Sequence, residues 1–156
     1  MNKIFYTNPV FPNKVALIVT DKSTDELRQL GILTEDSKYL INPVEGELMT
    51  YRISCVKFDN PENPTALVFD VDAIRQAYIE QIRTLRDPIL DTLDYLQQRA
   101  IATNNTQAVA SIEADKEILR KLTETVDYSN ITEIRHLYTR IPPELLVDYK
   151  EKYSNV

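Results

Sequence analysis

Pairs of carboxylates are the side chains in this chain whose spacing could support chemistry. Paired carboxylates can act as general acid and general base, or they can bind a hard cation through oxygen. No nucleophile motif or glycine-rich phosphate loop accompanies them, and the chain has only two glycines with which to build one. We therefore expect these acids to cap helices or to lie on solvated faces, and we predict neither a catalytic residue nor an enzyme. The pairs are Glu35 with Asp36, Asp70 with Asp72, and Asp91 with Asp94.

Nitrogen and sulfur ligands are scarce, since the chain has one histidine, His136, and one cysteine, Cys55. A structural zinc site needs four such ligands, and a lone cysteine cannot form an internal disulfide. We expect His136 at the surface or at a helix end, and Cys55 as a small buried hydrophobe. The sequence therefore predicts no metal site and no cofactor.

Charge and hydropathy limit the partners. The 156 residues carry a formal net charge of −6, and the 18 basic residues are scattered along the chain. Nucleic acids and anionic membranes bind clustered Lys and Arg, and a signal peptide or a membrane span needs a long apolar run that is missing here. We expect a soluble protein of the reducing cytosol without a nucleic-acid or membrane partner. The oligomeric state is not predicted.

The composition changes near residue 70. Five of the eight prolines and both glycines precede it, and long charged segments with periodic apolar residues follow it. This change predicts a small β-rich subdomain over 1–69, and a helical hairpin with a C-terminal helical segment over 70–156. The expected fold class is α+β: a small N-terminal mixed β subdomain, then a long helical hairpin and short C-terminal helices.

Short strands are expected in the first part, separated by turns. Ser23 and Glu26 form a capping box that predicts a short helix, which Gly31 ends. The segment 51–58 alternates large and polar residues, which is the period of a half-buried strand. The expected strands cover residues 4–6, 14–19, 39–41, 51–58 and 66–69.

The second part predicts two long helices. The first is capped by Asp70 or Asp72, and Pro88 either kinks it or opens a new helix that keeps the direction. Asn104 and Asn105 then form a turn that allows an antiparallel second helix. The apolar seam of the first helix contains Ile74, Tyr78, Ile82, Leu85, Ile89, Leu93, Leu96 and Ala100.

The second helix, over 106–125, has a weaker apolar stripe, with Asp115 and Lys116 in its gap. A short element over 132–138 follows, and Pro143 opens a terminal helix. The stripe contains Val109, Ile112, Leu119, Leu122 and Val126.

A longer motif runs through the hairpin. Residues 82–94 read I-R-x-x-R-D-x-x-L-x-x-L-D, and I-x-x-x-K-x-x-L-R follows at 112–120. This resembles a small phage protein family in which an R-x-x-R-D-x-x-L-x-x-L-D helix is followed by a G-D turn and an I-x-x-x-K-Q-x-L-R-D helix. The match runs without a gap from Arg83 to Leu122. This chain departs from the family pattern at the turn, where Asn104 and Asn105 stand, and at Lys121, which replaces the usual Asp.

Members of this family are usually encoded beside tail-fibre genes and resemble tail fibre assembly chaperones. The resemblance implies a non-enzymatic helper that binds the phage tail fibre protein and assists its folding, trimerisation or attachment in the host cytoplasm. The alternative is a structural adaptor that remains in the virion, bound to the tail fibre.

Two surfaces could bind such a partner. Segment 51–58 could add a strand of the client to its edge through Tyr51, Ile53, Val56 and Phe58, or the outer face of the hairpin could hold the client. The motif charges Arg83, Arg86 and Arg120 are further candidates. The interpretation that we favour is that these arginines instead pair within the hairpin with Asp87, Asp91, Asp94 and Glu117.

Overall fold

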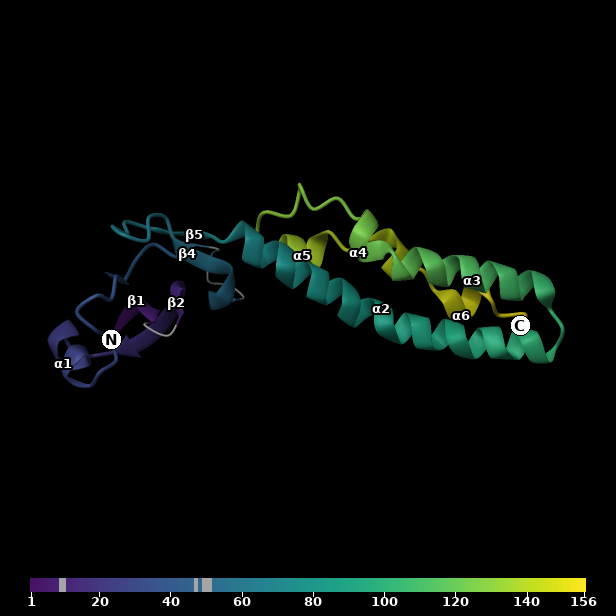
Figure 1. Ribbon diagram of the computed structural model, residues 1–156, viewed down its shortest axis with the longest axis horizontal. Helices are drawn as coiled ribbons and strands as arrows, with labels where there is room; N and C mark the ends of the chain where they lie inside the picture. Colours follow the sequence, from purple (N-terminus) through teal and green to yellow (C-terminus); the bar gives the residue numbers. More distant parts are fainter. Residues whose placement is uncertain (9–10, 47, 49–51) are drawn as a thin grey trace. The chain divides into compact units, whose positions relative to one another are not determined.

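The structure is a computed structural model that describes residues 1–8, 11–46, 48 and 52–156. It divides into two compact units, Met1–Ile74 and Arg75–Val156 (Figure 1). The first unit is built mainly of short strands and the second of helices, which confirms the predicted α+β class. The unit boundary lies a few residues beyond the composition change near residue 70.

Within the described residues, the strands of the first unit form two antiparallel sheets, one with the order β2-β1-β3 and the other pairing β4 with β5. The short helix α1 follows β2, and a 3-10 turn, η1, precedes β4. The bounds are β1 Asn2–Asn8, β2 Phe11–Thr20, α1 Thr24–Gln29, β3 Tyr39–Ile41, η1 Ile53–Cys55, β4 Val56–Phe58 and β5 Leu67–Phe69.

Both faces of the larger sheet are covered. On one face, Phe5 of β1 packs with Phe58 and Leu67 of the second sheet. On the other face, Ile4 packs with Leu27 of α1 and with Leu33. The apolar run that predicts β2 contributes half-buried side chains to both clusters: Val15 and Leu17 pack against the Phe5 cluster, and Ile18 packs against the Ile4 cluster.

Local signals in the first unit are confirmed where they were strongest. The Ser23 hydroxyl accepts from the backbone N–H of Glu26, and the Glu26 carboxylate accepts from the backbone N–H of Ser23, so the capping box is complete. Gly31 takes a φ of +72° just after the helix, a conformation that side chains disfavour. The strand predicted over 39–41 is β3.

The strand predicted over 51–58 is wrong over 53–55. Those residues form η1, and only Val56–Phe58 is extended. Cys55 and Val56 are neighbours in sequence and both are buried, at 1% and 3% exposure. A 3-10 turn has three residues per turn, so the period of two that predicts a strand is lost over 53–55. Tyr51 lies outside the described residues.

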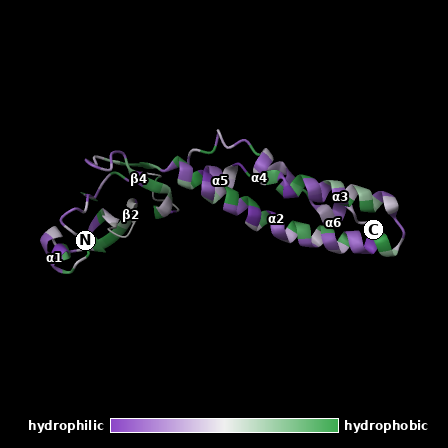
Figure 2. Ribbon diagram, in the orientation of Figure 1, coloured by the Kyte–Doolittle hydropathy of each residue, from purple (hydrophilic) through white to green (hydrophobic). Residues whose placement is uncertain are grey.

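The second unit is mainly helical. Its longest helix, α2, begins within the first unit, to which residues 71–74 belong. α2 and α3 form the predicted antiparallel hairpin, and the short elements that follow run alongside it (Figure 1). Hydrophilic and hydrophobic residues alternate along both long helices (Figure 2). The bounds are α2 Val71–Ala102, α3 Thr106–Arg120, α4 Leu122–Thr125, α5 His136–Thr139, η2 Pro143–Leu145 and α6 Tyr149–Lys152.

The ends of the hairpin helices follow the predicted capping chemistry. The Asp70 carboxylate accepts from the backbone N–H of Ala73, so Asp70 rather than Asp72 caps α2. Asn104 takes a φ of +55°, and the Asn105 side chain caps α3 by accepting from the N–H of Ala108. α2 continues through Pro88, so no new helix begins there. The helix predicted over 106–125 is divided at Lys121 into α3 and α4.

Side chains of α2 donate hydrogen bonds to backbone carbonyls of the C-terminal segment, which lies along this helix. The Arg75 Nε donates to the carbonyls of Tyr128 and Ile131, at 3.1 and 3.2 Å. Further along α2, the Tyr78 hydroxyl donates to the carbonyl of Arg140. These bonds satisfy carbonyls in a segment whose helices are only three or four residues long.

His136 begins α5 and is buried, at 5% exposure, so the helix-end expectation is confirmed and the surface alternative is wrong. Its Nδ1 accepts from the backbone N–H groups of Thr132 and Glu133, at 3.1 and 3.2 Å. Burial is the main cause that lowers the pKa of His136 below its usual value. Among the described residues, no helix is both long enough and apolar enough to cross a membrane.

Candidate functional site

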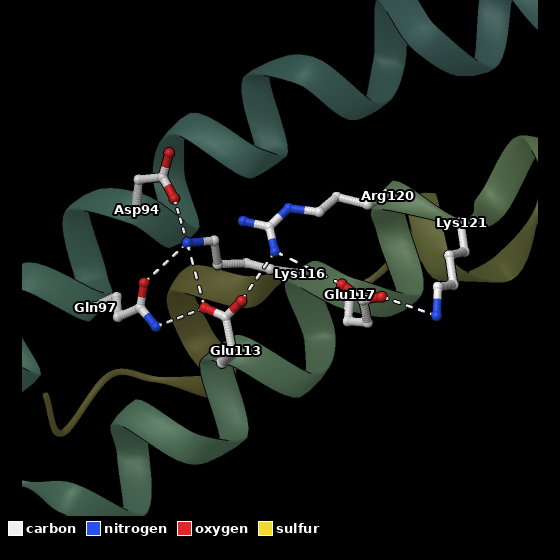
Figure 3. A network of polar contacts seen from close by, with 7 residues as sticks. All are labelled: Asp94, Gln97, Glu113, Lys116, Glu117, Arg120 and Lys121. Carbon is white, nitrogen blue, oxygen red and sulfur yellow. Dashed lines mark hydrogen bonds and ion pairs between the residues drawn. The ribbon is translucent and has the colours of Figure 1, made fainter.

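The matched motif places a buried cation between the two long helices. Lys116 of α3 is 6% exposed, and its Nζ lies 2.6 Å from Asp94 Oδ1 and 2.8 Å from Gln97 Oε1, both on α2 (Figure 3). Glu113, one turn earlier on α3, lies 3.6 Å from the same nitrogen. A buried ammonium needs such acceptors because desolvation otherwise favours its neutral form. The Lys116 contacts therefore join α2 to α3.

The network continues along α3. Gln97 Nε2 donates to Glu113 at 2.9 Å, and Arg120 Nη1 donates to the other Glu113 oxygen at 2.9 Å. These hydrogen bonds, that of Gln97 first, lower the pKa of Glu113 to about 2. Lys121 then pairs with Glu117 at 2.9 Å. We call these residues the hairpin network: Asp94, Gln97, Glu113, Lys116, Glu117, Arg120 and Lys121 (Figure 3).

The hairpin network consists of ion pairs and hydrogen bonds that connect two helices. Its acids and bases pair with one another, and Glu113 stays ionised far below neutral pH. A general acid or base instead needs a pKa near the working pH. The arrangement therefore connects α2 to α3 through paired side chains.

The other motif arginines pair on their own helix. Arg83 Nη1 lies 2.8 Å from Glu80, and Arg86 Nη2 lies 2.9 Å from Asp87. Arg120 pairs with Glu113 and, at 3.7 Å, with Glu117. The structure thus brings Arg120 into the hairpin network, whereas Arg83 and Arg86 stay in separate local pairs.

Asp115 joins the C-terminal segment to α3. Its Oδ2 lies 2.7 Å from Lys152 Nζ and accepts from the Tyr153 hydroxyl. Burial, followed by the bond to Asp115, raises the pKa of Tyr153. The sequence did not predict that Asp115 binds the C-terminal segment or that Lys116 binds α2, although both residues interrupt the apolar stripe. That interruption was the available signal.

The strand candidates for partner binding lie mostly in the core. Val56 and Phe58 are 3% and 4% exposed, and Phe58 packs with Phe5 and Leu67. Ile53 is half-buried in η1. The side chains of Val56 and Phe58 are therefore not on the surface of the folded first unit.

Two members of the carboxylate pairs, Asp70 and Asp94, have structural partners. Asp70 caps α2 and Asp94 binds Lys116, so one member of each of those pairs has a structural role. A pocket of about 350 Å³ in the first unit is lined by Asp70, Asp72 and Lys57 together with apolar residues. Across the described ranges, no three His, Cys, Asp or Glu side chains lie together as metal ligands would.

Comparison with known proteins returns no match, whether to a protein-family model, to a curated protein or to a solved structure.

Proposed function

We propose that this protein is an assembly chaperone for the tail fibre of a tailed phage. It binds the fibre protein and assists its folding, trimerisation or attachment, without catalysing a reaction. The proposal rests on the resemblance of residues 83–122 to a family usually encoded beside tail-fibre genes.

One observation carries the proposal: motif residues from the two halves of the match contact each other. Asp94 ends the first half of the motif, and Lys116 lies in the second half. Their side chains meet at 2.6 Å. The neighbouring motif leucines, Leu93 and Leu119, are both fully buried. The motif therefore specifies a hairpin held in one register, which supports a structural basis for the resemblance.

A rigid hairpin suits a chaperone for a fibre chain. Before trimerisation, such a chain exposes sheet edges and apolar faces that can aggregate. A preorganised binder can cover those surfaces while losing little conformational entropy of its own. The pairing of the motif charges within the hairpin is consistent with this scaffold role.

Co-expression with the neighbouring fibre gene tests the proposal. We expect the fibre protein to be insoluble or monomeric when expressed alone, and to be a soluble trimer that co-purifies with this protein when both are present. Lys116→Asp, which places a third carboxylate beside Asp94 and Glu113, should abolish the effect. Glu62→Lys, a charge change on an exposed loop of the first unit, is the matched control. A fibre that trimerises equally well alone would refute the chaperone.

Mass spectrometry of purified particles separates the chaperone from the adaptor. A chaperone that leaves after assembly is absent from particles in which the fibre is abundant. An adaptor remains at a fixed ratio to the fibre. The result decides between the two roles without altering the predicted binding to the fibre.

A further inference from the structure

The buried stripe of α2 weakens at its middle. Ile82 and Leu93 are 1% and 0% exposed, but Leu85 between them is 39% exposed. Ile89, one turn after Leu85, is half-buried. Leu85 and Ile89 belong to the predicted apolar seam, so part of the surface that was expected to pack against a partner helix is exposed to solvent.

A groove lies at this place. Pro88, Ile89 and Thr92 of α2 form one wall, and segment 147–150 forms the other, around a cavity of about 230 Å³. Beside it, Leu146 and Val147 are 68% and 42% exposed. Pockets for drug-sized molecules measure roughly 300–1,000 Å³. The groove is smaller than that and is continuous with exposed aliphatic side chains, which fits the side chains of a protein partner.

Two acidic residues of α2, Asp87 and Asp91, border the groove-lining residues Pro88 and Thr92 on the helix. Asp91 lies one turn after Asp87 and Pro88, and among the described residues it has no ion-pair partner. Asp87 is engaged by Arg86, and its side chain is 63% exposed. The opposite wall carries Asp148, which caps α6, and Lys150. Residues three apart on a helix are neighbours on its surface, so the Asp91 carboxylate beside Pro88 offers a site for a cation at the edge of the groove.

We propose that this groove binds a segment of a partner protein in which an aliphatic side chain stands next to Lys or Arg. The aliphatic group enters between Ile89 and Val147, and the cation pairs with Asp91. A second copy of this chain fits less well, because each copy carries a formal charge of −6 and like-charged surfaces repel. The proposal goes beyond the chaperone role, since it fixes the chemistry of the bound segment whatever protein supplies it.

A displayed library of random 15-residue peptides, selected against the full-length protein, tests the groove. We expect the enriched peptides to share an aliphatic residue beside Lys or Arg. Leu146→Asp should weaken the most enriched peptide about tenfold or more, since it places a charge in the apolar contact. Asp91→Lys should weaken it several-fold at low salt and less at high salt. Because both side chains are exposed, circular dichroism and melting should be unchanged.

Ile118→Asp is the matched control for Leu146→Asp, because Ile118 is 52% exposed on α3. It should leave peptide affinity unchanged. Selection of acidic peptides, failure to enrich any peptide, or binding that survives Leu146→Asp would each overturn the proposal. So would a concentration-dependent dimer that Leu146→Asp abolishes, because the groove would then join two copies. The peptide result is independent of whether the tail fibre is the client, so the two proposals can fail separately.

Discussion

The two units of this protein fix their register by different means. In the first unit, strands pair through backbone hydrogen bonds, and apolar clusters fill both sides of the larger sheet. The described ion pairs there are largely exposed, as in Arg28 with Asp25. In the second unit, Lys116 and Asp115 are placed at the contacts between helices.

The difference follows from how each element uses its backbone. A strand must pair its N–H and C=O groups with a neighbour, and that pairing sets the register. A helix satisfies these groups internally, so the register of neighbouring helices depends on how their side chains pack and pair. One polar contact of defined geometry can select a single arrangement. The comparison predicts that core truncation destabilises the first unit, and that polar truncation at Lys116 or Tyr153 measurably destabilises the second.

The largest effect is expected for Phe5→Ala. Phe5 is 0% exposed and joins the two sheets, so its removal should cost about 3–5 kcal/mol of unfolding free energy. Denaturant titration measures the loss. Hydrogen exchange should show that protection falls in β1 and β2 but not in α3. Equal loss in both units would contradict the separation between them.

Lys116→Ala should cost less, about 2 kcal/mol, because its acceptors on Asp94 and Glu113 are half-exposed and can be rehydrated. Lys116→Met keeps the buried aliphatic stem and should cost less than Lys116→Ala. A double-mutant cycle with Asp94→Ala isolates the pair. Complete additivity in that cycle would show that the 2.6 Å contact contributes no coupling.

Tyr153→Phe should cost about 1 kcal/mol, since it removes one hydrogen bond to Asp115 and keeps the ring. The loss should appear as faster hydrogen exchange in α6 and η2, with α2 and α3 unchanged. Tyr95→Phe, which removes the hydroxyl of a tyrosine that is 59% exposed on α2, is the control. If exchange in α3 accelerates as well, the C-terminal segment contributes to the hairpin itself.

The smallest effect is a pH dependence of the second unit between pH 5 and 8. The folded pKa of His136 lies below its usual value of 6.5, so the unfolded chain binds more protons than the native protein between those two values. Stability is therefore complete above about pH 6.5 and falls as the pH decreases toward the folded pKa. His136→Asn, whose Oδ1 can accept the same N–H groups, should flatten this dependence in melts between pH 5 and 8.

The sequence predicts the elements that depend on residues nearby in the chain, and it misses those that depend on contacts with residues far away in the chain. The capping box at Ser23 and the left-handed turn at Asn104 involve residues within one helical turn, and both are confirmed. The break at residues 53–55 depends on a core formed with β1 and β5, which periodicity within the segment cannot report. The pairing of Lys116 with α2 depends likewise on how the hairpin closes.

The candidate site follows the same rule. Arg86 pairs with Asp87, one of the acids that the sequence predicted, whereas Arg83 pairs with Glu80, which was not among them. The opening at Leu85 and Ile89 was not foreseen, because the heptad spacing treats every seam position as equivalent. Which seam position is left uncovered depends on the path of the segment after residue 126.

Cys55, the chain's lone cysteine, is 1% exposed and lies in the first unit. Burial raises the pKa of its thiol, so reaction with a disulfide reagent must await an opening of that unit. The rate at which the thiol is modified therefore measures how often the first unit opens. The second unit has no thiol, so it does not contribute to this rate. A client that slows the modification of Cys55 would be bound through the β-rich unit, and a client that leaves the modification rate unchanged would be bound elsewhere.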